Sequence, residues 1–326
     1  MAEQISRRHH TIPKFLLTRF ADERGQLKRV VLPGDKRHMA SVKDASVHNG
    51  FYLLLNEDGR ELDGFERYVG TIESAAAEAI RRVVDMGQFP PSVEDRTAIA
   101  ALVALQHLRT PAIREHHREL DDHVFKANIA VQGREGARRV LRQTHGREPS
   151  EEEIDAEWAY VSDTNNYQVR ASPGRHIHSI LQLFPGTTAQ FRDRAWMLMR
   201  WQRRGLVITD TPVLLHQEPE NRGMGLGLAT ADAVFMALDR RALLRLSEIG
   251  ESDTLAYGTT AMARDLNQNF VLEARQAFFH HPGDTAAVDK LQLPGPTTSE
   301  VEAGASFEDF VRMGEAYRQH AESSEK

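Results

Sequence analysis

The sequence predicts an α+β fold, in which helices dominate a single domain and a small, antiparallel sheet completes it. Three long segments carry apolar residues at helical spacing and predict helices: 64–86, 92–122 and 259–280. Four short apolar runs bounded by turn residues predict strands: 27–32, 51–55, 206–209 and 233–238. With 326 residues, the chain is long enough to bury a sizeable core. We expect one domain over 9–282 and a C-terminal extension over 283–326.

Composition narrows the class of protein. A hydrophobic content of 40% and a charged content of 27% are typical of a soluble globular chain. The net charge of -6 argues against a surface for indiscriminate nucleic-acid binding, although it allows a local basic cleft. The absence of cysteine excludes disulfides and thiolate metal sites. The longest apolar run, 98–105, is far shorter than the roughly 18 residues of a membrane span. We therefore expect a cytoplasmic protein without a membrane segment.

The N-terminal elements surround a pair of histidines. Pro13 and the apolar residues after it predict a short helix that the chain enters through His9 and His10. In the helix predicted over 64–86, Glu73 lies at the edge of the apolar stripe. Gly87 and the two prolines after it end that helix.

The central segment interrupts its own apolar face. Ser92 begins a helix as its N-cap, and residues 98–105 are apolar on every side, which predicts a buried helix. Gln106 and Arg109 then replace apolar residues, and Pro111 must kink or end the helix. Because an unpaired buried amide or guanidinium is costly, both side chains require partners from elsewhere in the chain.

The segment after this helix is the most polar part of the chain. Two helical patterns of opposite charge flank Pro149, and they predict a peripheral helical insertion over 125–167. Its charges are typical of solvated helix faces. An exposed apolar patch on this insertion would instead indicate a regulatory or interaction protein.

The C-terminal half predicts further helices and two strands. The apolar run 177–184 is expected to break at Pro185, and 187–204 to form a helix. A turn with a short helix is expected over 239–246, and another short helix near 307–317. In the helix predicted over 259–280, Asn269 falls on the inward stripe and requires a hydrogen-bond partner.

Candidate chemistry centres on an aspartate and several histidines. Asp210 directly follows a predicted buried strand. There it either binds a metal, acts as a base or orients a histidine, or it caps the following turn. His176 and His178 would share one face of a strand, a spacing that metals use but that is weakly specific. The glycine-rich segment 222–227 lacks the lysine of a phosphate-binding loop, which favours an ordinary loop.

Five segments together carry a resemblance to a known family. They are H-T-I-P with F-L-L-T-R-F, I-E-S-A-A, L-Q-H-L-R-T-P, I-T-D-T-P and L-N-Q-N. In this order and spacing they resemble a mainly bacterial family known as domain-of-unknown-function family 4238. The resemblance covers roughly 9–282 and is weakest over 125–167. It implies a single α+β domain that opens with the histidine–proline segment, and it implies no known reaction.

We hypothesise that six polar residues converge on one pocket. The residues that would act in catalysis are His10, Glu73 and Asp210, and those that would bind substrate are Gln106, Arg109 and Asn269. This set suits hydrolysis of a phosphodiester, as in a nuclease, with a divalent metal as an optional cofactor. The expected partner is nucleic acid or a phosphorylated small molecule. The alternative is a non-catalytic binding or regulatory module in which the same residues form a structural hydrogen-bond network.

Overall fold

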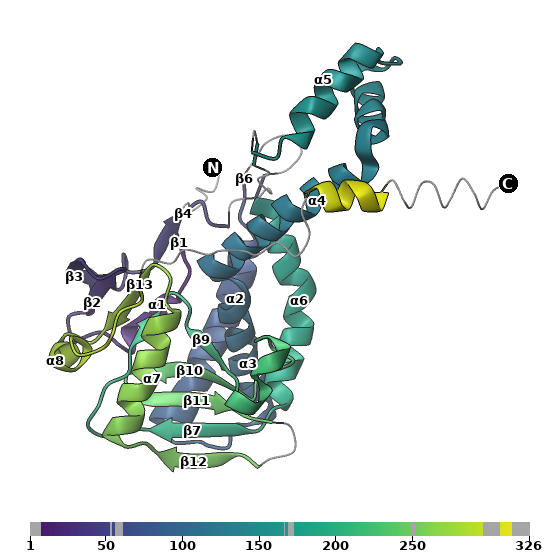
Figure 1. The fold of residues 1–326 in the computed structure, drawn as a ribbon. Coiled ribbons are helices and arrows are strands. Elements are labelled where there is room, and N and C mark those ends of the chain that lie inside the picture. The colour runs from purple at the N-terminus through teal and green to yellow at the C-terminus, as the bar shows by residue number, and fades with distance from the viewer. Residues whose placement is uncertain are drawn as a thin grey trace, which may run out of the picture. The chain divides into compact units, whose positions relative to one another are not determined.

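The computed structural model describes residues 8–52, 54–55, 61–165, 167–168, 173–248, 252–295 and 307–314 (Figure 1). The chain divides into two compact units. The first, called the main unit here, consists of Met1–Arg114 and Pro173–Thr297. The second, the helical unit, consists of Glu115–Ser172 and Thr298–Lys326.

The largest sheet of the main unit has five strands in the order β12-β7-β11-β10-β9. These strands are β7 (Trp196–Arg200), β9 (Val213–His216), β10 (Ala233–Asp239), β11 (Ala242–Leu246) and β12 (Thr254–Tyr257). Neighbouring strands run antiparallel except β12, which pairs in parallel with β7. The sheet is therefore mixed and large, and the expected small, antiparallel sheet is wrong.

The sheet is larger than predicted because two of its strands have local sequence patterns that also fit a helix. Residues 196–200 were expected to lie in a helix over 187–204, and 242–246 in a turn with a short helix. In the structure these segments are β7 and β11, which pair with each other so that Leu243 faces Met199 and Leu244 faces Leu198. Pairing across a buried sheet outweighs the weak local preference for a helix.

The second sheet of the main unit has four antiparallel strands in the order β3-β2-β13-β8. They are β2 (Gln26–Val31), β3 (Lys36–Ser41), β8 (Ile208–Thr209) and β13 (Ala277–His280). The expected helix over 259–280 is correct only for α7 (Thr260–Glu273). Strand β13 pairs with β2 on one side and β8 on the other, and its Phe278 and Phe279, which point to opposite faces of the sheet, are both buried.

Two short pairs of strands and four short helices also belong to the main unit. The pairs are β1 (Arg8–His10) with β4 (Val47–Asn49), and β5 (Leu54–Leu55) with β6 (Glu61–Leu62). The helices are α1 (Lys14–Thr18), the 3-10 helices η2 (Pro219–Met224) and η3 (Pro282–Asp284), and α8 (Thr285–Val288).

Three long helices pack together in the main unit (Figure 1). They are α2 (Gly64–Ile80), which continues as the π-helix η1 (Arg81–Asp85), α3 (Val93–Leu108) and α6 (Pro173–Asp193). Helix α3 packs against both α2 and α6. The expected break at Pro185 is wrong, because α6 continues through this proline. Phe184 and Phe191 are buried on either side of it, so packing holds the helix together despite the missing hydrogen bond.

The predicted ends of the central helix are confirmed. The Ser92 side chain accepts a hydrogen bond from the Asp95 backbone N–H and caps α3. Helix α3 ends at Leu108, and α4 (Pro111–His145) begins at the proline. Arg109 therefore lies at the C-terminal end of α3, where the chain changes direction.

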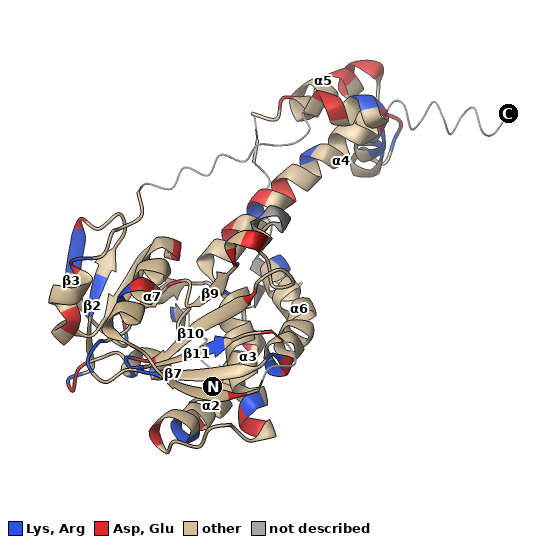
Figure 2. Cartoon of the chain, turned by 60° about the horizontal axis from the view of Figure 1, so that its bottom comes forward, with Lys and Arg blue, Asp and Glu red and all other residues tan. Residues whose placement is uncertain are grey.

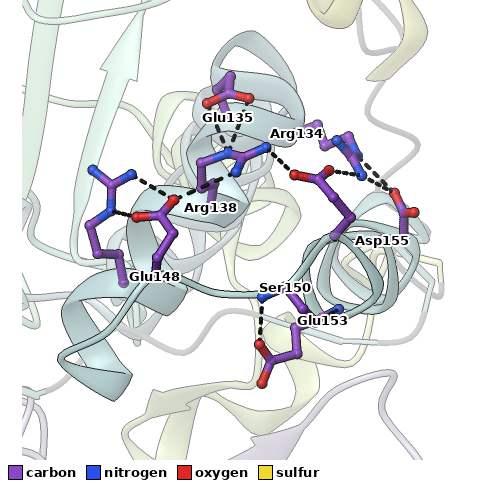
Figure 3. A network of polar contacts seen from close by, with 9 residues as sticks. Arg134, Glu135, Arg138, Glu148, Ser150, Glu153 and Asp155 are labelled. Carbon is purple, nitrogen blue, oxygen red and sulfur yellow. Dashed lines mark hydrogen bonds and ion pairs between the residues drawn. The ribbon is translucent and has the colours of Figure 1, made fainter.

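The helical unit contains the part of α4 beyond Arg114, α5 (Glu151–Ser162) and a helix over 307–314. Helix α4 has a non-helical residue at Gly133, whose φ of 60° favours glycine. Arg134 and Arg138 of α4 both bind Glu151 of α5 (Figure 3). Each pair is exposed and stabilises little by itself, but together they fix how α5 lies along α4.

Arg96 anchors the start of α3 to the five-stranded sheet. Its guanidinium donates to the backbone oxygens of Arg192 (2.7 Å) and Arg194 (2.5 Å) and to the Asp253 carboxylate (2.5 Å). It also lies 4.5 Å from the centroid of the Trp196 ring. One side chain thus joins α3, the end of α6 and the first residue of β7.

We predict that Arg96→Ala lowers the free energy of unfolding by about 3 kcal/mol, because it leaves two carbonyls and a carboxylate without their donor. Arg81→Ala is the control, since Arg81 is half exposed and pairs with Glu78 within its own turn, so its loss changes stability little. Urea unfolding of both variants measures the difference. Equal effects would contradict the role of Arg96 as an anchor.

Candidate functional site

A pocket of about 360 Å³ opens between the N-terminal segment and α2 in the main unit. Its lining consists of His10, Lys14, Phe15, Tyr52, Glu66, Val69, Gly70, Glu73, Ser74 and Ala77. Helix α2 contributes most of these residues. Glu66 and Glu73 are two turns apart and so lie on the same face of the helix, and Gly70 between them has no side chain to fill the space.

The two histidines of β1 have different roles because successive strand residues point to opposite sides. His9 is buried, and its Nδ1 accepts a hydrogen bond from the Tyr52 backbone N–H (2.8 Å). Its Nε2 must therefore carry the proton, and it lies 3.1 Å from the Glu66 carboxylate. His9 thus orients one of the two pocket carboxylates.

His10 is half-buried and lines the pocket itself. Its Nε2 lies 3.1 Å from the Lys43 carbonyl oxygen, which can only accept, so Nε2 carries the proton and Nδ1 is free to accept. Burial, together with the positive charge of Lys14, lowers the pKa of His10 below its usual value of 6.5. The imidazole is therefore neutral at pH 7.

Arg109 lies behind the pocket and is completely buried. It donates to the Glu73 carboxylate (2.7 Å), and Gln106, with its amide oxygen turned toward the guanidinium, accepts from Nε (2.8 Å). The Tyr52 ring is buried beside this group, and burial raises the pKa of its hydroxyl to about 12. Gln106 and Arg109 have thus found the partners that the sequence required, and Arg109 holds Glu73 at the pocket wall.

The pocket is consequently rich in hydrogen-bond acceptors. The Glu66 and Glu73 carboxylates and the His10 Nδ1 accept, while Lys14 is the cation on the lining. The Ser74 hydroxyl already donates to the Gly70 carbonyl (2.8 Å) and so also offers lone pairs. A ligand that donates several hydrogen bonds therefore fits this lining.

Asp210 lies elsewhere in the main unit. Its buried carboxylate accepts from the backbone N–H groups of Arg275 (3.0 Å) and Gln276 (2.7 Å), which lie between α7 and β13. Burial raises its pKa, an effect that these hydrogen bonds partly offset. Asp210 is not among the residues that line the pocket, so its expected convergence with His10 is wrong. It fixes the chain as it leaves α7.

Asn269 is also outside the pocket, and its expected inward position is wrong because it is exposed. The buried asparagine of α7 is Asn267. Its side chain accepts from the Val207 N–H (3.0 Å) and donates to the Gly205 carbonyl (2.9 Å). This residue holds α7 against the segment that leads into β8, which is a structural role.

Sequence reasoning missed Lys14, Tyr52 and Glu66 on the pocket lining, and it missed His9, which holds Glu66 from beside the pocket. Glu66 could have been found, since it lies two helical turns before Glu73 and therefore on the same face of a predicted helix. The sequence offers no signal for Tyr52, because its position depends on a turn that packs against β1 only in the folded chain.

Among the residues that the structure describes, no group of three histidine, aspartate or glutamate side chains could hold a metal ion. His176 and His178 lie in helix α6, so the expectation that they share one face of a strand is wrong. None of the helices in the described ranges is both long and apolar enough to span a bilayer.

The comparisons with known proteins identify a family. A model of the family described as protein of unknown function (DUF4238) matches residues 8–284. The chain belongs to the DUF4238 family. The resemblance seen in the sequence is thereby confirmed, and the match to DUF4238 spans all the residues of the pocket. No curated protein and no solved structure gives a match to this DUF4238 chain.

We predict that Arg109 and Glu73 are energetically coupled. Arg109→Met should lower the free energy of unfolding by about 3–5 kcal/mol, because Gln106 and Glu73 lose their donor. Glu73→Gln should lower the free energy of unfolding less in the Arg109→Met background than in the unmodified chain. In a double-mutant cycle measured by urea unfolding, we expect a coupling energy of about 1–3 kcal/mol.

Arg67→Met is the control for this cycle, because the Arg67 pair with Asp63 is exposed and lies within one turn of α2. It should leave stability nearly unchanged. Additive effects of the Arg109 and Glu73 substitutions would show that the two side chains do not act together.

Proposed function

We propose that the pocket binds a small molecule that carries an amine or guanidinium group. The supporting observation is the excess of acceptors on its lining, where two carboxylates and an unprotonated imidazole nitrogen face one lysine. A charged N–H donor bound to a carboxylate forms one of the stronger hydrogen bonds in proteins. A volume of about 360 Å³ suits a small molecule.

The residues that hold the two pocket carboxylates in place favour a binding site over a purely structural hydrogen-bond network. Glu66 is oriented by His9 from one side, and Glu73 by Arg109 from the other. Arg109 and Gln106 are sealed from solvent, whereas Glu73 remains about a quarter exposed (23%) and reaches the pocket. A preorganised acceptor costs less to bind, because its side chain is already ordered.

Isothermal titration calorimetry with agmatine and spermidine as probes tests this proposal. Glu73→Gln should weaken binding at least tenfold, because it removes the negative charge that meets the cation. The matched control is Glu78→Gln on the same helix, since Glu78 is not part of the lining. Absence of binding to the unmodified chain, or equal loss in both variants, would refute the proposal.

The pocket should also lose affinity for amines as the pH falls. Since the pKa of His10 lies below 6.5, His10 gains its proton only below that value, and the added positive charge then repels a cationic ligand. Binding should weaken between pH 7.5 and pH 5, and His10→Gln should reduce this dependence. An identical pH profile in the variant would contradict the assignment to His10.

We propose phosphodiester hydrolysis as a second candidate function. It is supported by the unprotonated Nδ1 of His10, which can remove a proton from an attacking water, on the same lining as the Lys14 cation. The carboxylates of Glu66 and Glu73 would repel a phosphate, so this activity requires a divalent metal to offset their charge. The substrate would be nucleic acid or a phosphorylated small molecule.

Hydrolysis of bis(p-nitrophenyl) phosphate and of labelled DNA and RNA, with and without Mg²⁺ or Mn²⁺, tests this candidate. His10→Gln should lower the rate by about 100-fold or more, as expected for loss of a general base. His38→Gln is the control, because His38 is exposed on β3. Activity that survives in His10→Gln would exclude this mechanism.

We propose a cytoplasmic location as well. The absence of cysteine supports it, since proteins of oxidising compartments are often stabilised by disulfides.

A further inference from the structure

Figure 2 marks the lysines and arginines in blue on the ribbon. Five of them line two hollows near the end of β7. They form what we call the basic surface: Arg200, Arg203, Arg204, Arg241 and Lys290. The first three belong to the end of β7 and the loop that follows it, and Arg241 lies in the turn between β10 and β11. The chain as a whole carries a net charge of -6, so this cluster differs in sign from the molecule around it.

The members of the basic surface have no carboxylate partners. None of the five forms an ion pair within the part of the chain that the structure describes. Arg200 donates instead to the Val84 carbonyl (2.8 Å). Some exposed arginines elsewhere are paired, as Arg134 and Arg147 of the helical unit show. Unpaired positive charges at this density favour an anionic partner.

Two carboxylates lie in the same hollows as the basic surface. Asp284 binds Arg240 at 2.7 Å, so its charge is balanced. Asp239 lies 3.3 Å from the Arg19 guanidinium, which also binds Asp85 at 2.5 Å. The excess of positive charge is therefore greatest in the hollow lined by Arg203, Arg204 and Lys290.

The basic surface spans two neighbouring hollows. One, of about 380 Å³, is lined by Arg200 and Arg241, and the other, of about 470 Å³, by Arg203, Arg204 and Lys290. Trp201 lines the first hollow, and its Nε1 donates to the carbonyl of Thr259, the neighbour of Thr260 in the second hollow (2.9 Å). A single phosphate would occupy one hollow, whereas a chain of phosphates can contact both.

An exposed aromatic ring accompanies these cations. Tyr257, at the end of edge strand β12, is 68% exposed and lines the same hollow as Arg200. An aromatic face beside a row of cations is the arrangement with which proteins bind single strands, because an unpaired base can stack on the ring.

We propose that the basic surface binds single-stranded nucleic acid. Arg203, Arg204 and Lys290 contact successive phosphates, and Tyr257 stacks on a base. This assignment is independent of the amine-binding pocket, since the two linings share no residue.

Fluorescence anisotropy with labelled 20-nucleotide dT and rU strands tests this inference on the full chain. The triple variant Arg203→Ala/Arg204→Ala/Lys290→Ala should bind at least tenfold more weakly. The slope of log affinity against log salt concentration should decrease by about 2, because each of the three lost phosphate contacts contributes roughly 0.7 to it. Tyr257→Ala should weaken binding about tenfold while the salt slope stays the same.

The control is the triple variant Arg24→Ala/Lys36→Ala/Arg275→Ala, which removes the same charge from exposed positions outside both hollows. It should bind as the unmodified chain does. Loss of affinity in this control equal to that in the first variant would overturn the inference, as would absence of binding to either strand at low salt.

Two further probes distinguish the partner. Inorganic polyphosphate that competes as well as dT would show a general polyanion surface, and a labelled 20-base-pair duplex that binds as tightly would show that no base is stacked. Either result would overturn the assignment to single strands. Weaker competition by both, together with the Tyr257→Ala effect, supports it.

Discussion

The main unit depends on how one buried positive charge is balanced. Arg109 is the C-cap residue of α3, and the next helix, α4, begins at Pro111. A completely buried guanidinium is tolerated only with partners, so Glu73 of α2 and Gln106 of α3 must lie beside it. The requirement that stabilises the packing of α2 on α3 thus also places a carboxylate at the wall of a pocket. The Arg109–Glu73 ion pair therefore contributes both to the packing of the helices and to the binding chemistry of the pocket.

Sequence reasoning succeeded where the local sequence allows only one structural outcome. The break at Pro111 follows from a ring that donates no hydrogen bond, and the need of Gln106 and Arg109 for partners follows from their place in an apolar run. It failed where the outcome depends on pairing with distant residues. The segment 242–246 has no strong local preference, and it becomes a strand because β7 and β10 offer edges on both sides. The sheet was therefore judged too small.

The same distinction explains which parts of the candidate site were found. An aspartate after a strand and before Thr-Pro has the same sequence pattern whether it serves catalysis or holds a turn. The outcome for Asp210 was decided by two backbone N–H groups near residue 275, far along the chain. On α7, Asn267 and Asn269 are two residues apart and so lie on nearly opposite faces of the helix, and the inward face was assigned to the wrong one of them. His10 and Glu73 were identified because each breaks an apolar pattern.

The net charge of the chain does not reveal that the pocket and the basic surface carry local charges of opposite sign. Screening limits the reach of exposed charges to about 8 Å at physiological salt, so each surface responds to its own neighbours and not to the total of -6. In the pocket the acceptors of Glu66 and Glu73 favour a cation. On the basic surface, the unpaired arginines after β7 favour an anion. One chemical group cannot satisfy both linings, because the pocket favours a cationic donor and the basic surface favours an anion.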